Sequence, residues 1–184
     1  MTSINAHATG FYVGVDAMRN DVANKLQDVP NTGLATDSNK DSNLSYGANA
    51  GFRLDLLGLL ASGEVFYDRL NLASEGFDGV GKDRVKIGQR YGARANIGYT
   101  ILPKIKPFIS YGLANISYKT NADFTINKST MTPIYGIGII VDLVANFSLK
   151  AAYDFQRFKT KYPNSIVEMK SNVGTARLGV MYQF

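Results

Sequence analysis

VGTARLGVMYQF, residues Val173–Phe184, closes the chain with a strict two-residue alternation. Such a period is typical of a β-strand that turns alternate side chains to opposite faces. The apolar face carries Ala176, Leu178, Val180, Tyr182 and Phe184, and the other face carries Thr175, Arg177, Gly179, Met181 and Gln183. The chain therefore ends in a strand with one apolar and one polar face.

Seven earlier segments alternate in the same way, and Leu44–Leu56 does so most clearly. Their apolar residues do not recur three and four apart, as a helix requires. Each segment reaches or approaches the roughly 9–11 residues of a tilted transmembrane strand. The segment Pro107–Tyr118 has apolar residues on both faces, and we leave its faces unassigned. The other predicted strands are Gly10–Met18, Ala61–Asp68, Lys86–Ile101, Pro133–Leu143 and Phe147–Phe158.

The connections between these segments alternate in length. Short ones follow the second, fourth and sixth segments: Leu57–Leu60, Leu102–Lys106 and Val144–Asn146. Long polar ones follow the first, third, fifth and seventh: Asn20–Asn43, Asn71–Val85, Lys119–Thr132 and Lys159–Asn172. An up-and-down meander places the two kinds at opposite ends, as outer-membrane barrels do with short periplasmic turns and long extracellular loops. We predict an all-β fold, an eight-stranded antiparallel up-and-down transmembrane β-barrel.

Length and composition agree with one domain over residues 1–184, with residues 1–8 as a periplasmic tail. The absence of cysteine excludes disulfides and cysteine-based sites. The net charge of +5 is dispersed along the chain, which argues against a nucleic-acid partner. Residues Met1–Ala8 lack the basic start and apolar run of a signal peptide, so the prediction of an outer-membrane location requires a mature form.

The polar faces of the predicted strands carry both signs of charge, interspersed with glycine. An eight-stranded barrel is just wide enough for side chains to fill, and a charge buried there must be paired. We predict that Arg90, Arg94 and Arg177 bridge Glu64, Asp68 and Asp154 in an ion-pair network that plugs the interior. The alternative is that the same charges line an ion path. The full predicted network is Arg53, Glu64, Asp68, Arg90, Arg94, Asp142, Lys150, Asp154 and Arg177.

The strand count, the loop asymmetry and the ending Val180-x-Tyr182-x-Phe184 resemble the small eight-stranded outer-membrane barrels typified by the OmpA transmembrane domain, including OmpX-, Ail- and Opa-like surface proteins. The resemblance covers the chain from about Ala8 onward. It implies a monomer in outer-membrane lipid and lipopolysaccharide, and a terminal Phe184 that the barrel-assembly machinery reads. It also implies a non-enzymatic role, through the extracellular loops, in adhesion to host surface molecules or in envelope integrity.

Other chemistry is weakly represented. Some small barrels are lipid A-modifying enzymes with a Ser/His pair, but His7 is the single histidine and precedes the first strand, so we expect no catalytic site, metal or cofactor. The last long connection is basic, with Lys159, Lys161 and Lys170, and either contacts lipopolysaccharide phosphates or acidic glycans or is a solvated surface. A soluble lipocalin-like carrier with its apolar face inward is a further alternative, although the chain lacks tryptophan.

Overall fold

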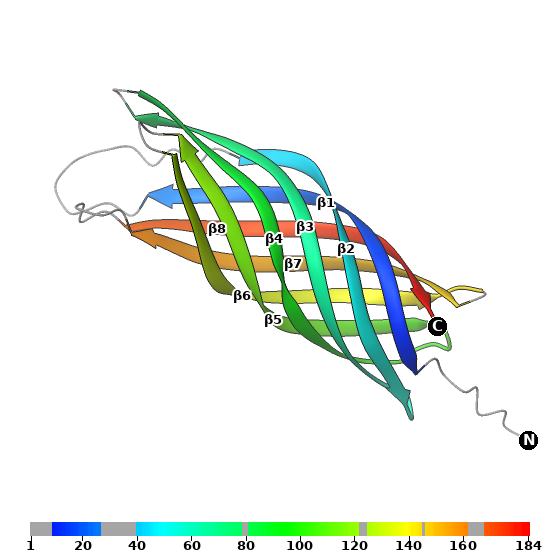
Figure 1. The fold of residues 1–184 in the computed structure, drawn as a ribbon. Helices are drawn as coiled ribbons and strands as arrows, with labels where there is room; N and C mark the ends of the chain where they lie inside the picture. The colour runs from blue at the N-terminus through cyan, green and yellow to red at the C-terminus, as the bar shows by residue number, and fades with distance from the viewer. Residues whose placement is uncertain (1–8, 27–39, 79–80, 122–124, 145, 162–167) are drawn as a thin grey trace, which may run out of the picture.

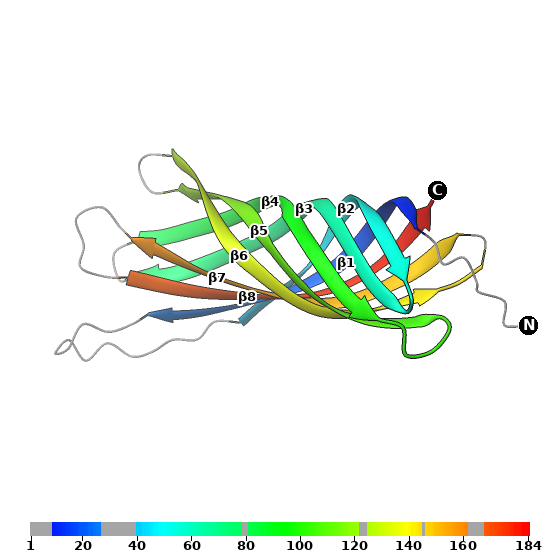
Figure 2. The ribbon, with the colours of Figure 1, turned by 90° about the horizontal axis from the view of Figure 1, so that it is seen from below.

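The computed structural model describes residues 9–26, 40–78, 81–121, 125–144, 146–161 and 168–184. The described chain forms a closed barrel in which each strand pairs with its neighbours in sequence and β1 pairs with β8 (Figures 1 and 2). This confirms the predicted eight-stranded antiparallel barrel. The strands are β1 Gly10–Leu26, β2 Lys40–Leu56, β3 Leu59–Asp78, β4 Gly81–Tyr99, β5 Ile105–Asn121, β6 Thr125–Asp142, β7 Phe147–Lys161 and β8 Glu168–Gln183.

The terminal strand β8 closes the barrel by pairing with β1 from Tyr12↔Gln183 to Leu26↔Met169. At the end of this ladder the backbone N–H of Phe184 donates to the carbonyl of Phe11 over 2.9 Å. Figure 1 shows the C-terminus beside the start of β1, at the end of the barrel that holds the short turns. We call this the short-turn end and the opposite one the hairpin end.

The two faces of each strand lie as the alternation predicts. The outward residues Phe11 and Leu178 are 69% and 61% exposed, whereas the inward residues Asp68 and Arg90 are fully buried. Large apolar side chains thus cover the outside of the barrel and charged side chains lie inside. The soluble carrier is contradicted by this arrangement, because it requires the apolar face to turn inward.

Strand β5, whose faces the sequence left open, turns Ile109, Tyr111 and Leu113 outward. Its inward residues include the buried Phe108 and Ile116. Both faces look apolar in the sequence because β5 supplies part of the apolar packing inside the barrel as well as part of the lipid-facing surface.

The strands are longer than predicted at the hairpin end. Strands β3 and β4 pair up to Asp78↔Gly81, so the expected long loop Asn71–Val85 is mostly a β-hairpin. The same holds for Lys119–Thr132, where β5 and β6 pair up to Asn121↔Thr125. Two-residue alternation marks a strand in the sequence only where one of its faces is apolar. This part of the chain is largely polar, so the sequence indicates loops there. Residues 27–39 and 162–167 of the other two expected loops lie outside the described residues.

The register of β4 shifts between Ile87 and Gln89. The prediction of unbroken alternation through Gly88 is therefore wrong. This glycine is exposed rather than inside the barrel, and a Cβ added to it would meet nothing within 4 Å. An extra residue in one strand reverses the faces beyond it, which a single sequence does not reveal. None of the described residues forms a helix that is long and apolar enough to cross a membrane.

Candidate functional site

Twelve charged side chains from the described strands meet inside the barrel, six cations and six carboxylates, in two groups. Strand alternation brings them inward, since each lies on the polar face of its strand. The larger group, the central cluster, is electrically neutral. It contains Arg90, Arg94, Lys150 and Arg177 with Asp16, Glu64, Asp68 and Asp154.

Arg177 on β8 is the most highly connected member of the central cluster. Its Nη1 lies 2.7 Å from Asp16 Oδ2 on β1, and its Nη2 lies 2.9 Å from Asp68 Oδ2 on β3 and 3.1 Å from Asp154 Oδ2 on β7. The guanidinium is fully buried and offers five N–H donors in a fixed fork, so it can serve carboxylates from three directions. One side chain therefore ties β8 to three other strands.

Glu64 on β3 is the second junction of the cluster. It pairs with Arg94 on β4 and, over 3.3 Å, with Lys150 on β7, and the Tyr12 hydroxyl donates to its Oε2 over 2.6 Å. Arg94 also lies 2.9 Å from Asp154 Oδ2. Asp154 thus joins Arg94, the partner of Glu64, to Arg177, and the cluster crosses the barrel from β3 to β7.

A chain of hydrogen bonds that begins at Arg90 continues the cluster toward the hairpin end. Arg90, which lies 2.8 Å from Asp68 Oδ2, donates through Nη1 to Thr175 Oγ1 over 3.2 Å. Thr175 donates to Asn20 Oδ1 over 2.8 Å, and Asn20 Nδ2 donates to Ser45 Oγ over 2.9 Å. These hydrogen bonds link β1, β2, β4 and β8 in this part of the interior.

The smaller group, the mouth cluster, contains Arg53, Asp55, Lys106 and Asp142 at the short-turn end. Arg53 Nη2 lies 2.7 Å from Asp55 Oδ2 and 3.0 Å from Asp142 Oδ2. Lys106 Nζ lies 2.7 Å from Asp55 Oδ2 and 2.5 Å from Asp142 Oδ2. Each cation bridges both carboxylates, and this group is also neutral.

An apolar layer adjoins the mouth cluster. On β5 and β6 the inward residues next to Lys106 and Asp142 are Phe108 and Ile140, and these pack with side chains from β1, β3 and β8. A low-dielectric layer beside the ion pairs strengthens their attraction and raises the cost of leaving one unpaired. The layer consists of Tyr12, Leu60, Phe108, Ile140 and Met181.

Inward glycines provide the room for the central cluster. A Cβ on Gly179 would collide with Asp16 Oδ1, and one on Gly47 would collide with Asp68 Oδ1. On Gly112 it would collide with the carbonyl of Ala93 and with the side chain of Arg94. These three glycines thus lie where charged side chains of the central cluster pass.

All nine residues of the network predicted from sequence lie inside the barrel, and each has an ion-pair partner. The sequence also places Asp16 and Asp55 among the polar-face charges, although they are not among these nine, and it misses Lys106 altogether. Lys106 was assigned to a turn, whereas β5 begins at Ile105 and turns this lysine inward. Asp16 and Asp55 do lie on the polar faces of predicted strands, and this position is the signal that identifies them.

Three other predicted residues, Val180, Tyr182 and Phe184, lie on the exposed outer face of the C-terminal end. The Tyr182 ring contacts the rings of Phe147 and Phe184, with centroids 5.1 and 5.3 Å apart. The lysines of the expected basic loop lie in strands instead, with Lys159 on β7 paired with Lys170 on β8 and Lys161 paired with Glu168. His7 lies outside the described residues, and the described ones form no group of three or more histidine or acidic side chains suited to a metal ion.

Comparisons with known proteins bear on the fold. No protein-family model matches the chain, and no curated protein matches it. Among solved structures, Neisserial surface protein A (NspA) superposes with a TM-score of 0.63 at 17% identity, covering 96% of this chain and 99% of that one.

Two further solved structures are similar. For the outer membrane protein OprG from Pseudomonas aeruginosa the TM-score is 0.58 at 11% identity, with 97% of each chain covered. For Ail, the attachment invasion locus protein of Yersinia pestis, it is 0.54 at 17% identity, with 95% of this chain and 99% of that one covered. The chain therefore has the fold of the small eight-stranded outer-membrane β-barrels.

Proposed function

We propose that this protein is a non-enzymatic surface protein of the bacterial outer membrane, with a plugged interior and a binding surface at its hairpin end. The observation that carries the proposal is the contrast between the two sides of the wall. Outside, large apolar side chains are exposed as lipid requires; inside, the charges of both clusters are paired in neutral groups. A barrel filled in this way stabilises itself in the membrane and leaves its ends for contact with partners.

The hairpin end offers the larger of the two surfaces. Strands β3 and β4 have 20 and 19 residues, about twice the 9–11 that a tilted strand needs to cross the membrane. At the short-turn end β2 and β3 are joined by only Leu57 and Gly58. We therefore expect the hairpins to face the cell exterior and to contact host surface molecules or other envelope components.

Shortened hairpins test the surface role. One variant replaces the paired segment Ser74–Val85 by Asn-Gly, and another replaces Phe158–Ser171 in the same way. Both cuts leave the central and mouth clusters intact, so heat-modifiable migration in detergent gels should persist. We expect binding of the expressing cells to host-cell monolayers, or resistance of the envelope to detergents, to fall in at least one variant. Wild-type behaviour of both variants in both assays would contradict the surface role.

A small ion-conducting pore is the second candidate. Among the described interior atoms, Asp16 Oδ1, Asn49 Oδ1 and Asn96 Oδ1 have no hydrogen-bond partner, and water could occupy these places. Planar-bilayer recording separates the two functions. The plugged barrel should show no steady conductance, whereas reproducible ion-selective steps that change in Arg177→Met would favour the pore.

The terminal residues suit a role in assembly. Phe184 ends the chain on the exposed apolar face, 73% exposed, and its ring contacts Tyr182. If the assembly machinery reads this end, deletion of Phe184 should lower the amount of barrel in the outer membrane of cells. Refolding of the same variant into detergent should be unchanged, which distinguishes lost recognition from lost stability.

A further inference from the structure

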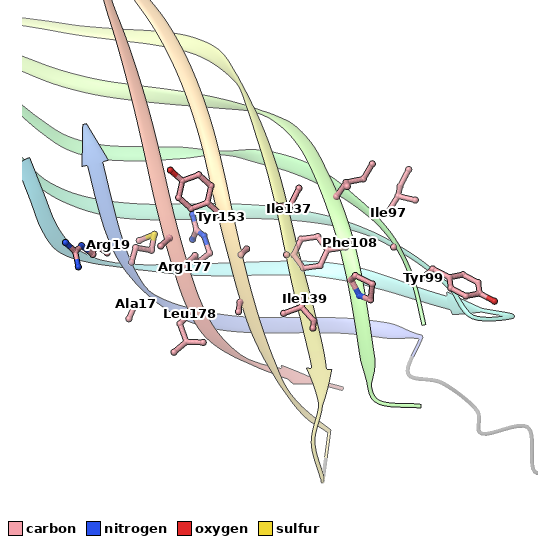
Figure 3. A pocket seen from close by; sticks show the side chains of 18 of the residues that line it. Ala17, Arg19, Ile97, Tyr99, Phe108, Ile137, Ile139, Tyr153, Arg177 and Leu178 are labelled. Carbon is pink, nitrogen blue, oxygen red and sulfur yellow. The ribbon is translucent and has the colours of Figure 1, made fainter. Parts of the chain in front are cut away.

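The apolar outer surface of the barrel continues from the wall onto the short turns. Figure 3 shows Ile97 and Ile137 on the outer wall and Tyr99 toward its short-turn end. At the hairpin end, the exposed Arg69 and Arg157 limit this surface. At the short-turn end the turns themselves carry exposed large apolar side chains, which we call the apolar rim: Leu56, Leu57, Leu59, Ile101, Leu102, Leu143 and Val144. The lipid-facing surface therefore has a charged border at one end and a largely apolar border at the other.

The backbone of these turns is hydrogen-bonded within the protein. Each turn is joined to a neighbouring strand end by one N–H···O=C bond, and the three bonds run from Thr100 to Gly58 over 2.7 Å, from Asp142 to Lys104 over 2.9 Å and from Gln183 to Asn146 over 3.0 Å. In the β4–β5 turn the Ile105 N–H donates to the Leu102 carbonyl over 3.0 Å, and the exposed Pro103 between them has no N–H to leave unsatisfied. Backbone inside a membrane must satisfy its polar groups within the protein, and these bonds do so for the groups named.

The β2–β3 turn keeps a strained leucine at its tip. Leu57 has a φ of 50°, in the left-handed region that disfavours leucine, whereas the β6–β7 turn has the more tolerant Asn146 at a φ of 66°. The Leu57 side chain is 96% exposed, so packing within the protein does not offset this strain. The Tyr99 ring lies beside the same turn, since a Cβ on Gly58 would be 3.3 Å from it. Strain at an exposed apolar residue, next to a residue type typical of membrane interfaces, indicates a contact outside the chain.

We propose that the three short turns are embedded in the membrane leaflet on their own side, at the boundary between acyl chains and headgroups, instead of lying in the periplasm. Lipid is the occupant because the apolar rim is continuous with the lipid-facing wall. The exposed Lys104 fits this depth, because its apolar stem can lie among acyl chains while its amine reaches the headgroups. The inference rests on the membrane location of the proposed function, and it leaves the hairpin end as the part of the barrel that projects into water.

Two other partners fit the apolar rim less well. A second copy inserted in the same direction has its rim at the same depth, so two rims cannot meet end to end. A periplasmic protein docked over this end would also cover the polar mouth cluster inside the rim, where the Asp142 side chain is 24% exposed. Lipid covers the rim alone, because it already lies against the adjoining wall and leaves the mouth to water.

Single cysteines can place a probe on the turns, because the chain has no cysteine of its own. Leu57→Cys, Leu102→Cys and Val144→Cys are each labelled with the polarity-sensitive fluorophore NBD and refolded into phosphatidylcholine vesicles, with heat-modifiable migration as the check of folding. Ile137→Cys on the outer wall is the lipid control, and Ser129→Cys, exposed on β6 at the hairpin end, is the water control. We expect the turn positions to emit at shorter wavelength than position 129. Spin-labelled lipids should quench them more than iodide does when iodide is present on both sides of the bilayer.

The same cysteines report on the turns in cells. A membrane-impermeant maleimide, added to cells whose outer membrane has been made permeable to it, should label Ser129→Cys quickly. It should label the three turn variants about tenfold more slowly, because an apolar environment suppresses the reactive thiolate. Leu57→Asn would not test the contact, because relief of the strain in the turn opposes the loss of lipid contact.

Turn positions that iodide quenches as strongly as position 129 would overturn the proposal. Turn positions open to iodide in vesicles but closed to maleimide in cells would overturn it in favour of a periplasmic protein. The control at Ile137 separates this inference from the proposed function. Iodide quenching there as strong as at Ser129 would contradict the membrane wall itself, whereas a lipid-shielded Ile137 with water-exposed turns would contradict the embedding of the turns alone.

Discussion

Arg177 contacts carboxylates on β1, β3 and β7, and its removal has a predictable cost. Replacement by Met keeps much of the side-chain volume but leaves the central cluster with four carboxylates and three cations. Breaking a buried ion pair in this way costs about 3–5 kcal/mol, because the remaining charge is buried without compensation. We expect Arg177→Met to lower the free energy of unfolding by that amount in urea titrations of the detergent-refolded barrel.

The control for that experiment is Arg157→Met. Arg157 is also an arginine with a side-chain hydrogen bond, but it is exposed on the outer wall, so we expect a loss below about 1 kcal/mol. An equal loss in both variants would mean that the interior ion pairs add no more to stability than an exposed contact does.

Alanine substitutions at two glycines compare a crowded inward position with an open outward one. In Gly112→Ala the new methyl group meets the Ala93 carbonyl and the side chain of Arg94, and overpacking of this kind costs about 1–3 kcal/mol. In Gly63→Ala it meets nothing within 4 Å on the outer face, and the stiffer unfolded chain should raise stability by about 0.4–1 kcal/mol. Urea midpoints that move in the same direction for both would show that the inward glycines are not there to make room.

At the scale of the strands, two-residue alternation predicts a strand reliably only where one of its faces is apolar and the other is polar. Along most of the described side chains of β2, β7 and β8, outward and inward positions alternate, so the faces of these strands are readable from the sequence alone. β5 is not readable, because Phe108 and Ile116 pack inside while Ile109 and Tyr111 face outward. Lys106 was missed because it follows a turn, and the extra pairing of β3 with β4 was missed because the sequence there is largely polar. What the sequence leaves open is therefore where a strand ends and where its phase shifts.

The connection from β2 to β3 contains a strained residue. Leu57 has φ of 50° and Gly58 has φ of 86°, the positive values that a two-residue hairpin turn requires at both positions. A leucine in this left-handed region costs roughly 1–2 kcal/mol, whereas asparagine tolerates it. Because Leu57 is 96% exposed and loses little packing, Leu57→Asn should raise the free energy of unfolding by about 1 kcal/mol. The neighbour Leu56, which pairs with Leu59 in the ladder, is the control: Leu56→Asn should not stabilise.

For the molecule as a whole, the height of the apolar outer surface determines the bilayer thickness in which the barrel is most stable. On β8 this surface extends from Ala176 to Phe184, and at about 3.3 Å per residue and a tilt of about 40° it is roughly 20–25 Å high. Arg19 and Arg69, both exposed, limit it at the hairpin end. A bilayer much thicker than this surface must thin locally around the barrel, at a cost for each ångström of mismatch.

We therefore expect the folded fraction, measured by heat-modifiable migration, to be highest in vesicles of short-chain phosphatidylcholine and to fall as the acyl chains lengthen. Without any amphiphile the exposed apolar side chains have no cover, and the refolded chain should aggregate. Arg19→Leu tests the boundary directly, since it extends the apolar surface by one residue at the hairpin end and should shift the preference toward thicker bilayers. A monodisperse barrel in plain buffer, or a folded fraction indifferent to acyl-chain length, would contradict the assignment of the outer wall to lipid.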